Sequence, residues 1–273
     1  MMERIEFYKM TGGGNDFIII DNREGMIDVN TFRPFIRKVC RRKLSVGADG
    51  LIIIESSDQA HFRWQFFNAD GSQAEMCGNG GRCVAKLAHL LGIAPSELTF
   101  ETSVGIIRAQ VRGNVVKLSL PPPSSIELGL SLRVGDEEHS IDFINTGVPH
   151  AVIFTQNIEE IEVVNVGRSI RYHQTFQPAG TNVDFISINN SEINIRTYER
   201  GVEDETLACG TGAVAAAIIA HLRGKVTSPT RVIPSSGEVL TIHYKGGKEI
   251  REVYLEGEVT LVYQGWLWKE SIS

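Results

Sequence analysis

The stretch AEMCGNGGRCVAKLAHLLG, residues 74–92, places a cysteine directly before a glycine-rich turn that opens into a predicted helix. The stretch TLACGTGAVAAAIIAHLRG, residues 206–224, repeats this arrangement. Aligned on Cys77 and Cys209, the two stretches agree at eight of sixteen positions. The repeat predicts that the chain contains two copies of one structural unit.

A second, looser similarity pairs GNDFIII, residues 14–20, with GTNVDFISI, residues 180–188, because Asn and Asp precede an apolar strand in both. The divide between the copies is expected near LSLPPPSSIELG, residues 118–129, since three consecutive prolines cannot donate to a helix or a sheet. We assign residues 1–121 with 262–273 to the first domain and residues 122–261 to the second.

The overall composition favours a small-molecule partner in the cytoplasm. The 273 residues carry a formal net charge of −6, with 42% hydrophobic and 22% charged residues, which gives no electrostatic reason to expect nucleic acid or an anionic membrane as a partner. The amino terminus, MMERIEFYKM, does not resemble a signal peptide, and no later apolar run is long enough to span a bilayer. Four cysteines without Cys-x-x-Cys spacing indicate free thiols rather than disulfides or a structural metal site.

The strand pattern predicts an α+β fold. Runs such as DFIIID, GLIIIE, HFRWQFFN, VDFISI and EINIRTYE are short, β-like and separated by turns, without a regular alternation of strand and helix. The run AVAAAIIAHL is apolar on every side, which is typical of a helix enclosed by core. We therefore expect two pseudo-symmetric domains, each a mostly antiparallel sheet wrapped around a central helix.

The positions of Cys77 and Cys209 indicate chemistry rather than packing. An intracellular cysteine is usually a small buried hydrophobe. At the amino end of a helix, however, unpaired N–H groups and the helix dipole stabilise a thiolate, and a free thiol pKa of ~8.5 is lowered there. Cys83 is replaced by Ala215 in the second copy and Cys40 has no counterpart, so both are expected to be structural.

Two thiols facing one ligand suit the inversion of a stereocentre, because one thiol removes a proton from a carbon and the other returns a proton to its opposite face. No lysine lies in a recognisable pyridoxal phosphate motif. The developing negative charge of an amino acid carboxylate could instead be held by backbone N–H groups at the two helix ends. These groups belong to Gly78, Asn79, Gly210 and Thr211.

The chain resembles the diaminopimelate epimerase family along almost its whole length. The resemblance is carried by KMTGGGNDFIIID, FFNADGSQAEMCGNGGRC, GVPHAV, GTNVDFISI and RTYERGVEDETLACGTGA, in family order. It implies a cytoplasmic, cofactor-independent isomerase that interconverts LL- and meso-diaminopimelate for lysine and peptidoglycan precursor synthesis. It also implies a homodimer.

The resemblance further implies roles for individual residues. Cys209 is the proton acceptor and Cys77 the donor in the LL-to-meso direction, while Glu199 lies near the reacting amino group and His150 assists the site. Substrate binding is implied for Asn15, Asn68, Asn182 and Arg200.

Each of these residues also has a simpler interpretation. Asn15 and Asn182 could form turns before strands, Glu199 and Arg200 could be a solvated pair, and His150 could be a loop residue without a role. His89 and His221 occupy equivalent helix positions and are expected to be structural.

The chain departs from the common family pattern at its substrate end. Many members have His-Gly-x-Gly-Asn where this chain has TGGGN, residues 11–15. Val148 replaces an asparagine that contacts the distal end of the substrate, and Gly50 stands where some members have a glutamine. The loss of one polar contact to a buried carboxylate costs about 1–3 kcal/mol.

Three alternatives remain open from sequence. A broader amino acid racemase or proline-type racemase of the same fold would keep both cysteines but leave Arg200 without a distal carboxylate to bind. A non-catalytic amino acid binder would need the N–H groups but not the thiols. A thiol hydrolase would need one nucleophile with a base, which gives no reason for the second cysteine. Phenazine-biosynthesis-like isomerases of this fold group lack the cysteine pair.

Overall fold

The computed structural model describes residues 4–27, 33–74, 76–134, 137–247, 249–268 and 270. The chain forms two compact units: unit 1 contains residues 1–118 and 257–273, and unit 2 contains residues 119–256. The chain passes from one unit to the other within strand β8 (Val115–Leu120) and returns within strand β17 (Ile250–Glu258). The domain boundaries that we assigned from sequence, after residues 121 and 261, stay a proposal.

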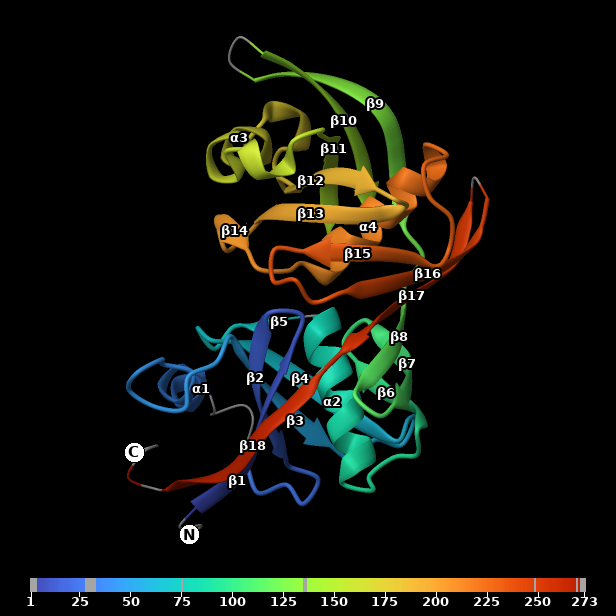
Figure 1. Ribbon diagram of the computed structural model, residues 1–273. Coiled ribbons are helices and arrows are strands. Elements are labelled where there is room, and N and C mark those ends of the chain that lie inside the picture. The colour runs from blue at the N-terminus through green and yellow to red at the C-terminus, as the bar shows by residue number, and fades with distance from the viewer. Residues whose placement is uncertain are drawn as a thin grey trace. The chain divides into compact units, whose positions relative to one another are not determined.

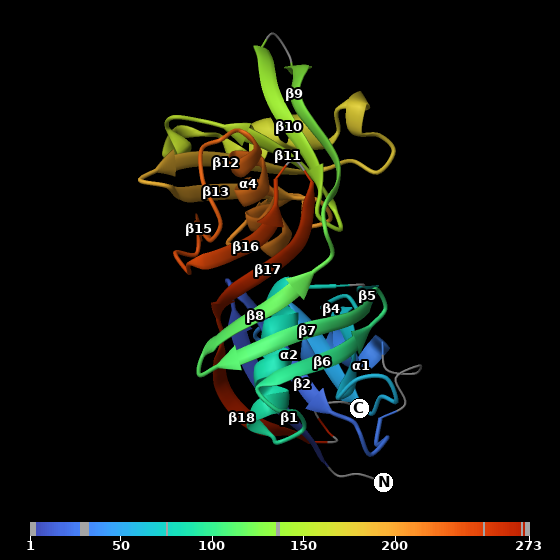
Figure 2. The same cartoon turned by 90° about the vertical axis from the view of Figure 1, so that its right-hand side faces the viewer.

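Unit 1 surrounds a long helix with strands (Figures 1 and 2). Besides β8, its strands are β1 (Arg4–Gly12), β2 (Asn15–Asp21), β3 (Gly50–Glu55), β4 (Phe62–Asn68), β5 (Gln73–Ala74), β6 (Glu97–Thr102), β7 (Gly105–Arg112) and β18 (Thr260–Trp268). Its helices are α1 (Arg33–Val39) and α2 (Gly78–Leu90).

Unit 2 has the same plan (Figure 1). Besides β17, its strands are β9 (Ser124–Val134), β10 (Glu137–Asn145), β11 (Pro149–Phe154), β12 (Asn182–Asn189), β13 (Glu192–Glu199), β14 (Asp204–Thr206), β15 (Thr230–Pro234) and β16 (Leu240–Gly246). Its helices are α3 (Val163–Arg171) and α4 (Gly210–Leu222), with 3-10 turns η2 (Ile158–Glu160) and η3 (Gln174–Phe176).

The strand pairings of the two units correspond one to one. In unit 1, β2 pairs with β1 antiparallel and with β3 parallel, β4 pairs with β3 antiparallel, and β6 pairs with β4 parallel. In unit 2, β11, β10, β12, β13 and β15 make the same pairings in the same order. The expected fold class is confirmed, although each sheet contains parallel pairs at the crossovers that carry its helices.

This correspondence corrects one of our sequence alignments. We paired the strand after Asn15 with the strand after Asn182, but β2 corresponds to β11, whereas β12 corresponds to β3. Asn182 therefore stands in the place of Gly50, and the counterpart of Asn15 is Val148, next to the neighbouring strand β11. The shared Asn and Asp therefore do not occupy equivalent positions in the two units.

Helices α1 and α3, which the sequence pattern did not reveal, cover the second face of each sheet. Along β2, Phe17 and Ile19 pack in the cluster around α2, while Ile18 and Ile20 pack with Ile36 of α1. A strand buried on both faces reads as an unbroken apolar run rather than as an alternation. The run DFIIID is such a strand, and its lack of alternation is the sign of a helix on each side.

The two central helices differ in charge. Helix α4 is buried along its middle, and its small side chains let it contact strands from β10 to β13 together with β15 and β16. Helix α2 also lies in core but contains Arg82 and Lys86, both buried, whereas α4 contains no Lys, Arg, Asp or Glu. The Lys86 ammonium donates to the Asn114 side chain at 2.6 Å and to the Val259 carbonyl at 3.1 Å.

The histidines near the ends of these helices have the same structural part in both units. The Nδ1 atom of His89 lies 3.3 Å from the Ala94 carbonyl oxygen, and the Nδ1 atom of His221 lies 3.3 Å from the Val226 carbonyl oxygen. Each histidine connects the helix end to the segment that follows it.

No helix among the described residues has the length and apolar character needed to cross a lipid bilayer.

Truncation of the α4 core should be costly. Ile218 is fully buried, so Ile218→Ala should lower the free energy of unfolding by about 2–5 kcal/mol through lost burial and a residual cavity. Urea denaturation followed by circular dichroism measures the change. Val202→Ala, at a side chain that is 57% exposed, is the control and should stay within about 0.5 kcal/mol of the wild type. Equal effects of the two substitutions would contradict the packing described for α4.

Candidate functional site

Cys77 and Cys209 are the N-cap residues of α2 and α4. Their backbones are extended, with φ −142° and ψ 115° at Cys77 and φ −120° and ψ 113° at Cys209, and the helix begins at the next residue in both cases. The Cys77 sulfur accepts a hydrogen bond from the Gly80 N–H at 3.4 Å. The predicted position of each thiol at the amino end of a helix is thus the position that it has in the structure.

The other two cysteines lie in core. Cys83 is fully buried in the cluster around α2. Burial raises the pKa of the Cys40 thiol to about 12, and the nearby Lys9 only partly offsets this effect. A thiol that stays protonated at neutral pH is a poor base, so the structural interpretation of Cys40 agrees with its surroundings.

In unit 1, two of the predicted substrate-binding residues are joined to each other. The Asn79 side-chain amide donates to Asn15 Oδ1 at 2.8 Å and to the Gly13 carbonyl at 3.3 Å, and Asn79 Oδ1 accepts from Arg82 at 2.7 Å. Asn68 ends β4 and donates to the Ser72 hydroxyl at 3.0 Å in the following turn. The first turn of α2 and the start of β2 are therefore held as one surface.

Asn15 is held by an ionic cluster of Lys9, Asp16, Arg42 and Asp49. The Asn15 amide donates to Asp49 Oδ2 at 3.0 Å, and Arg42 bridges Asp49 and Asp16 at 2.8 and 2.6 Å. Lys9 completes the cluster at 2.7 Å from Asp16. Although burial opposes ionisation, hydrogen bonds from Arg42 and Lys9 hold the pKa of Asp16 below its usual value. The Asn15 amide thus has a fixed orientation, with one N–H and one lone pair left for a ligand.

Gly50 has a packing reason for lacking a side chain. A Cβ atom built at Gly50 would lie 2.6 Å from a ring carbon of Phe66 and 2.7 Å from the Phe67 carbonyl oxygen. Any larger residue at this position therefore requires both the Phe66 ring and the β4 backbone at Phe67 to move.

In unit 2, the predicted residues form one hydrogen-bonded network under the first turn of α4. His150 lies on β11 and is fully buried, so it is not a loop residue. Its Nδ1 atom lies 2.7 Å from Asp184 Oδ2, and its Nε2 atom lies 3.0 Å from the Thr211 hydroxyl. The Thr211 hydroxyl in turn lies 3.3 Å from the Cys209 sulfur.

Asn182 and Arg200 extend this network. The Asn182 amide nitrogen lies 3.3 Å from His150 Nε2, and Asn182 Oδ1 accepts from the Arg200 backbone N–H at 2.7 Å. The Arg200 guanidinium donates to the Ala179 carbonyl at 3.2 Å. Glu199 ends β13, in the place that Asn68 has at the end of β4 in unit 1. These two contacts use one N–H and one lone pair of the Asn182 amide and fix its orientation.

The electrostatic surroundings of Cys209 differ from those expected at a helix end. Burial raises the pKa of the Cys209 thiol well above its usual value, and the nearby carboxylates of Glu199 and Asp184 raise it further. Hydrogen bonds from Thr211 and from the Gly212 backbone act in the opposite direction. Burial and the two neighbouring carboxylates therefore act against ionisation of this thiol.

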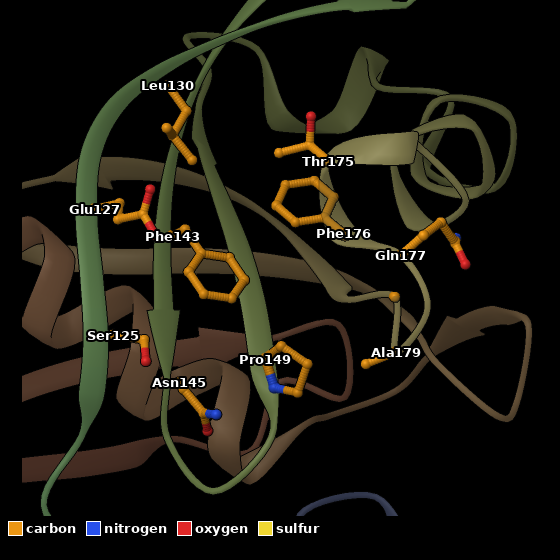
Figure 3. A pocket seen from close by; sticks show the side chains of 11 residues that line it. Ser125, Glu127, Leu130, Phe143, Asn145, Pro149, Thr175, Phe176, Gln177 and Ala179 are labelled. Atoms are coloured by element: carbon orange, nitrogen blue, oxygen red, sulfur yellow. The ribbon is translucent and has the colours of Figure 1, made fainter.

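A pocket of about 400 Å³ lies elsewhere in unit 2, against β9, β10 and the η3 turn (Figure 3). Phe143 and Phe176 point toward each other inside it and stack at 5.6 Å between ring centres. The lining residues are Ser125, Glu127, Leu130, Phe143, Asn145, Pro149, Thr175, Phe176, Gln177, Ala179 and Gly180. None of them is a predicted site residue, so we do not assign this pocket to the site.

Sequence reasoning missed the residues that hydrogen-bond to the predicted site residues and orient them. Asp184 and Thr197 are buried in strands, and Asp49 lies in a loop before β3. The available signal was Asp184 itself, because a single carboxylate inside the apolar run NVDFISI needs a buried partner.

Comparisons with known proteins agree with the sequence motifs. The family model described as Diaminopimelate epimerase matches residues 7–120 and 143–262. The diaminopimelate epimerase of Aquifex aeolicus (strain VF5) is 47% identical, with 98% of this chain and 100% of the relative covered. That of Archaeoglobus fulgidus is 39% identical, with 97% and 96% covered.

Solved structures with low sequence identity share the fold. The Bacillus anthracis phenazine biosynthesis protein of the PhzF family gives a TM-score of 0.73 at 16% identity, covering 97% of this chain and 99% of that chain. A hydroxyproline epimerase from Agrobacterium vitis gives 0.72 at 16% identity, covering 97% and 91%. With near-complete coverage by the family model and by relatives at 39–47% identity, the chain belongs to the diaminopimelate epimerase family.

Proposed function

We propose that this protein interconverts LL- and meso-diaminopimelate by direct proton transfer between the substrate α-carbon and the thiols of Cys77 and Cys209. The observation that carries the proposal is the cysteine N-cap built twice, at corresponding positions of two corresponding units. A ligand carboxylate binds well at such helix ends because their N–H groups lack intrahelical partners. In this mechanism both thiols act on the same carbon.

In the LL-to-meso direction Cys209 accepts the α-proton and Cys77 donates one to the opposite face. The backbone N–H groups of Gly78, Asn79, Gly210 and Thr211 hold the substrate carboxylate as it gains charge, which lowers the barrier to proton removal. The reaction supplies the meso isomer for lysine and peptidoglycan precursor synthesis.

The remaining site residues bind the substrate in this proposal. Arg200 binds the distal carboxylate, for which a planar guanidinium is well suited, and Glu199 binds the amino group. Asn15, Asn68 and Asn182 supply neutral donors and acceptors, and His150 assists Cys209. The fixed amide of Asn15 supports this assignment because its orientation is set before the substrate arrives.

Removal of either thiol should abolish epimerisation. Cys77→Ala and Cys209→Ala should each lower the rate of meso product formation by roughly 10²- to 10⁴-fold, the usual contribution of a general acid or base. The measurement is NMR of the protein with LL-diaminopimelate in D2O without added cofactor, which follows deuterium at the α-carbon. Cys83→Ala and Cys40→Ala are the matched controls and should keep the activity.

Parallel samples of L-proline and L-glutamate test the substrate class. Exchange into diaminopimelate alone supports the epimerase, and exchange into the other amino acids would indicate a broader racemase. If the wild-type protein exchanges deuterium into none of the three, the two-thiol mechanism is wrong.

Val148 should weaken the binding of diaminopimelate relative to an asparagine at that position. It lies in the β10–β11 turn, where the Thr146 hydroxyl donates to the Thr211 carbonyl at 3.2 Å and so holds the turn against the first turn of α4. One added hydrogen bond is worth about 0.5–1.5 kcal/mol, so Val148→Asn should lower KM by roughly 2- to 12-fold with little change in kcat. Val148→Ala is the control for size. An unchanged KM in Val148→Asn would mean that this position does not face the substrate.

We further infer that the protein acts as a homodimer in the cytoplasm. A reducing compartment keeps both thiols free, as the mechanism requires. Strand β18 supports an interface, because it exposes large apolar side chains that would cost free energy in water. They are Val262, Tyr263, Trp266 and Trp268.

A charge placed on this strand should separate the dimer. Trp266 is 49% exposed, so Trp266→Glu should leave the unit folded while moving the sedimenting mass from twice the 30.2 kDa chain mass to the chain mass itself. Sedimentation velocity makes the measurement. Leu44→Glu, at a loop residue that is 70% exposed, is the control and should remain dimeric. A wild-type protein that sediments as a monomer would contradict the inferred interface.

A further inference from the structure

The two units differ most directly beneath their cysteine-capped helices. The structure pairs Ile52 with Phe66 on β3 and β4, and it pairs Asp184 with Thr197 at the corresponding place on β12 and β13. On the neighbouring strand, Phe17 of β2 takes the place that His150 has on β11. An apolar layer in unit 1 is therefore replaced by a buried carboxylate, a hydroxyl and an imidazole in unit 2.

The glycine in the first turn of each helix reflects the same difference. A Cβ atom built at Gly80 would lie 3.1 Å from the Ile52 side chain, whereas one built at Gly212 would lie 2.6 Å from Asp184 Oδ1. The Asp184 carboxylate thus lies directly below the amino end of α4. The partial positive charge of a helix amino terminus stabilises an anion at this place.

The hydrogen-bond partners fix where the protons of this network lie. Asn182 Oδ1 is occupied by the Arg200 backbone N–H, so the Asn182 NH2 group is the one that faces His150 Nε2. Nε2 must then be an acceptor, and His150 carries its proton on Nδ1, where it donates to Asp184. The Thr211 hydroxyl donates to the same Nε2 atom and can accept from the Cys209 thiol.

We propose that Thr211, His150 and Asp184 form a proton relay that takes the proton of Cys209, so that unit 2 holds the resting thiolate. The inference rests on the proposed function for the assignment of Cys209 as the proton acceptor. In the relay step the Cys209 S–H proton moves to Thr211 Oγ1 while the Thr211 hydroxyl proton moves to His150 Nε2. The products are a thiolate and an imidazolium, and Asp184 keeps its negative charge and its hydrogen bond from Nδ1.

The relay explains how the Cys209 thiol can ionise although its surroundings raise its pKa. Burial and the carboxylates of Glu199 and Asp184 raise the pKa of the Cys209 thiol, so ionisation by simple loss of a proton to solvent is unfavourable there. Transfer to His150 keeps the proton nearby, and the imidazolium lies between the thiolate and Asp184. Within unit 2, the titratable groups that face the thiol are Glu199 on β13, Asp184 on β12 and, through Thr211, His150 on β11.

Asp184 and Thr211 are positioning residues in this scheme. Asp184 selects the His150 tautomer that can receive a proton at Nε2, and it is itself held by the Thr197 hydroxyl at 2.7 Å. Thr211 supplies the hydroxyl that connects the imidazole to the sulfur.

The relay is tested by the rate at which iodoacetamide alkylates each cysteine, measured between pH 5 and 10 by mass spectrometry of the Cys77 and Cys209 peptides. Thr211→Val removes the hydroxyl without changing the side-chain size, and it should slow alkylation of Cys209 at pH 7 at least ~10-fold and move its profile to higher pH. Alkylation of Cys77 should change less than about 2-fold. Thr211→Ser keeps a hydroxyl and should restore the wild-type profile.

Asp184→Asn provides an independent second test. An amide at this position can donate to Nδ1 and so favours the wrong tautomer of His150, which should move the Cys209 profile to higher pH. Loss of the Asp184 charge by itself would move the profile to lower pH, so a net shift to higher pH identifies the effect of the relay. Circular dichroism and thermal unfolding establish that each variant is folded. Because Thr211 is only half-buried, Thr211→Val keeps the test decisive even where Asp184→Asn does not fold.

The outcomes separate the relay from the proposed function. Alkylation needs no substrate, so an unchanged Cys209 profile in Thr211→Val overturns the relay even if the wild-type protein epimerises diaminopimelate. Equal slowing of Cys77 and Cys209 would also overturn it, since that result indicates a general change in the fold. A selective shift at Cys209 in a protein that epimerises nothing would keep the relay and remove the proposed function.

Discussion

The close approach of a helix amino terminus to the strand beneath it is the constraint on which both units depend. Gly80 and Gly212 lie in the first turns of α2 and α4, where a Cβ atom would meet Ile52 or Asp184. Without a side chain at these positions, the helix can enter the core with its unpaired N–H groups directed out of it. The cysteine N-cap then stands at the edge of a rigid and well-packed element, which is what a proton-transfer group needs.

The two units contain similar cysteine sites, and the residues beneath their helices make these sites unequal. Unit 1 fills the layer under α2 with aromatic and aliphatic side chains, so Cys77 is supported by packing and by its own helix turn. Unit 2 fills the same layer with Asp184, His150 and Thr197, all buried and all hydrogen-bonded. A buried polar group costs free energy unless it is hydrogen-bonded. Because Asp184, His150 and Thr197 all have hydrogen-bond partners, this network can be kept in the core of unit 2. Different surroundings for Cys77 and Cys209 suit a reaction in which one thiol acts as the acid while the other acts as the base.

The local order of the chain was largely readable in advance, and its long-range pairing was not. The helices after Cys77 and Cys209 begin where the glycine-rich turns predicted, and most of the strand runs became strands. The predicted equivalence of Asn15 and Asn182 was wrong, because residue spacing along a strand does not reveal which strand lies beside it. Helices α1 and α3 were also missed, since they have only seven and nine residues, which is shorter than the window over which helical periodicity is recognised.

The sequence by itself determined that two copies of one α+β unit exist, that each begins its central helix at a cysteine, and which family the motifs resemble. These properties are local, since they follow from residue type, spacing and repetition. Only the tertiary structure decided that Asp184, His150 and Thr211 meet under one of the two helices, while Asp49 and Arg42 orient Asn15 in the other unit. Such contacts join residues far apart in the chain through sheet register and burial, and no periodicity along the sequence encodes that register.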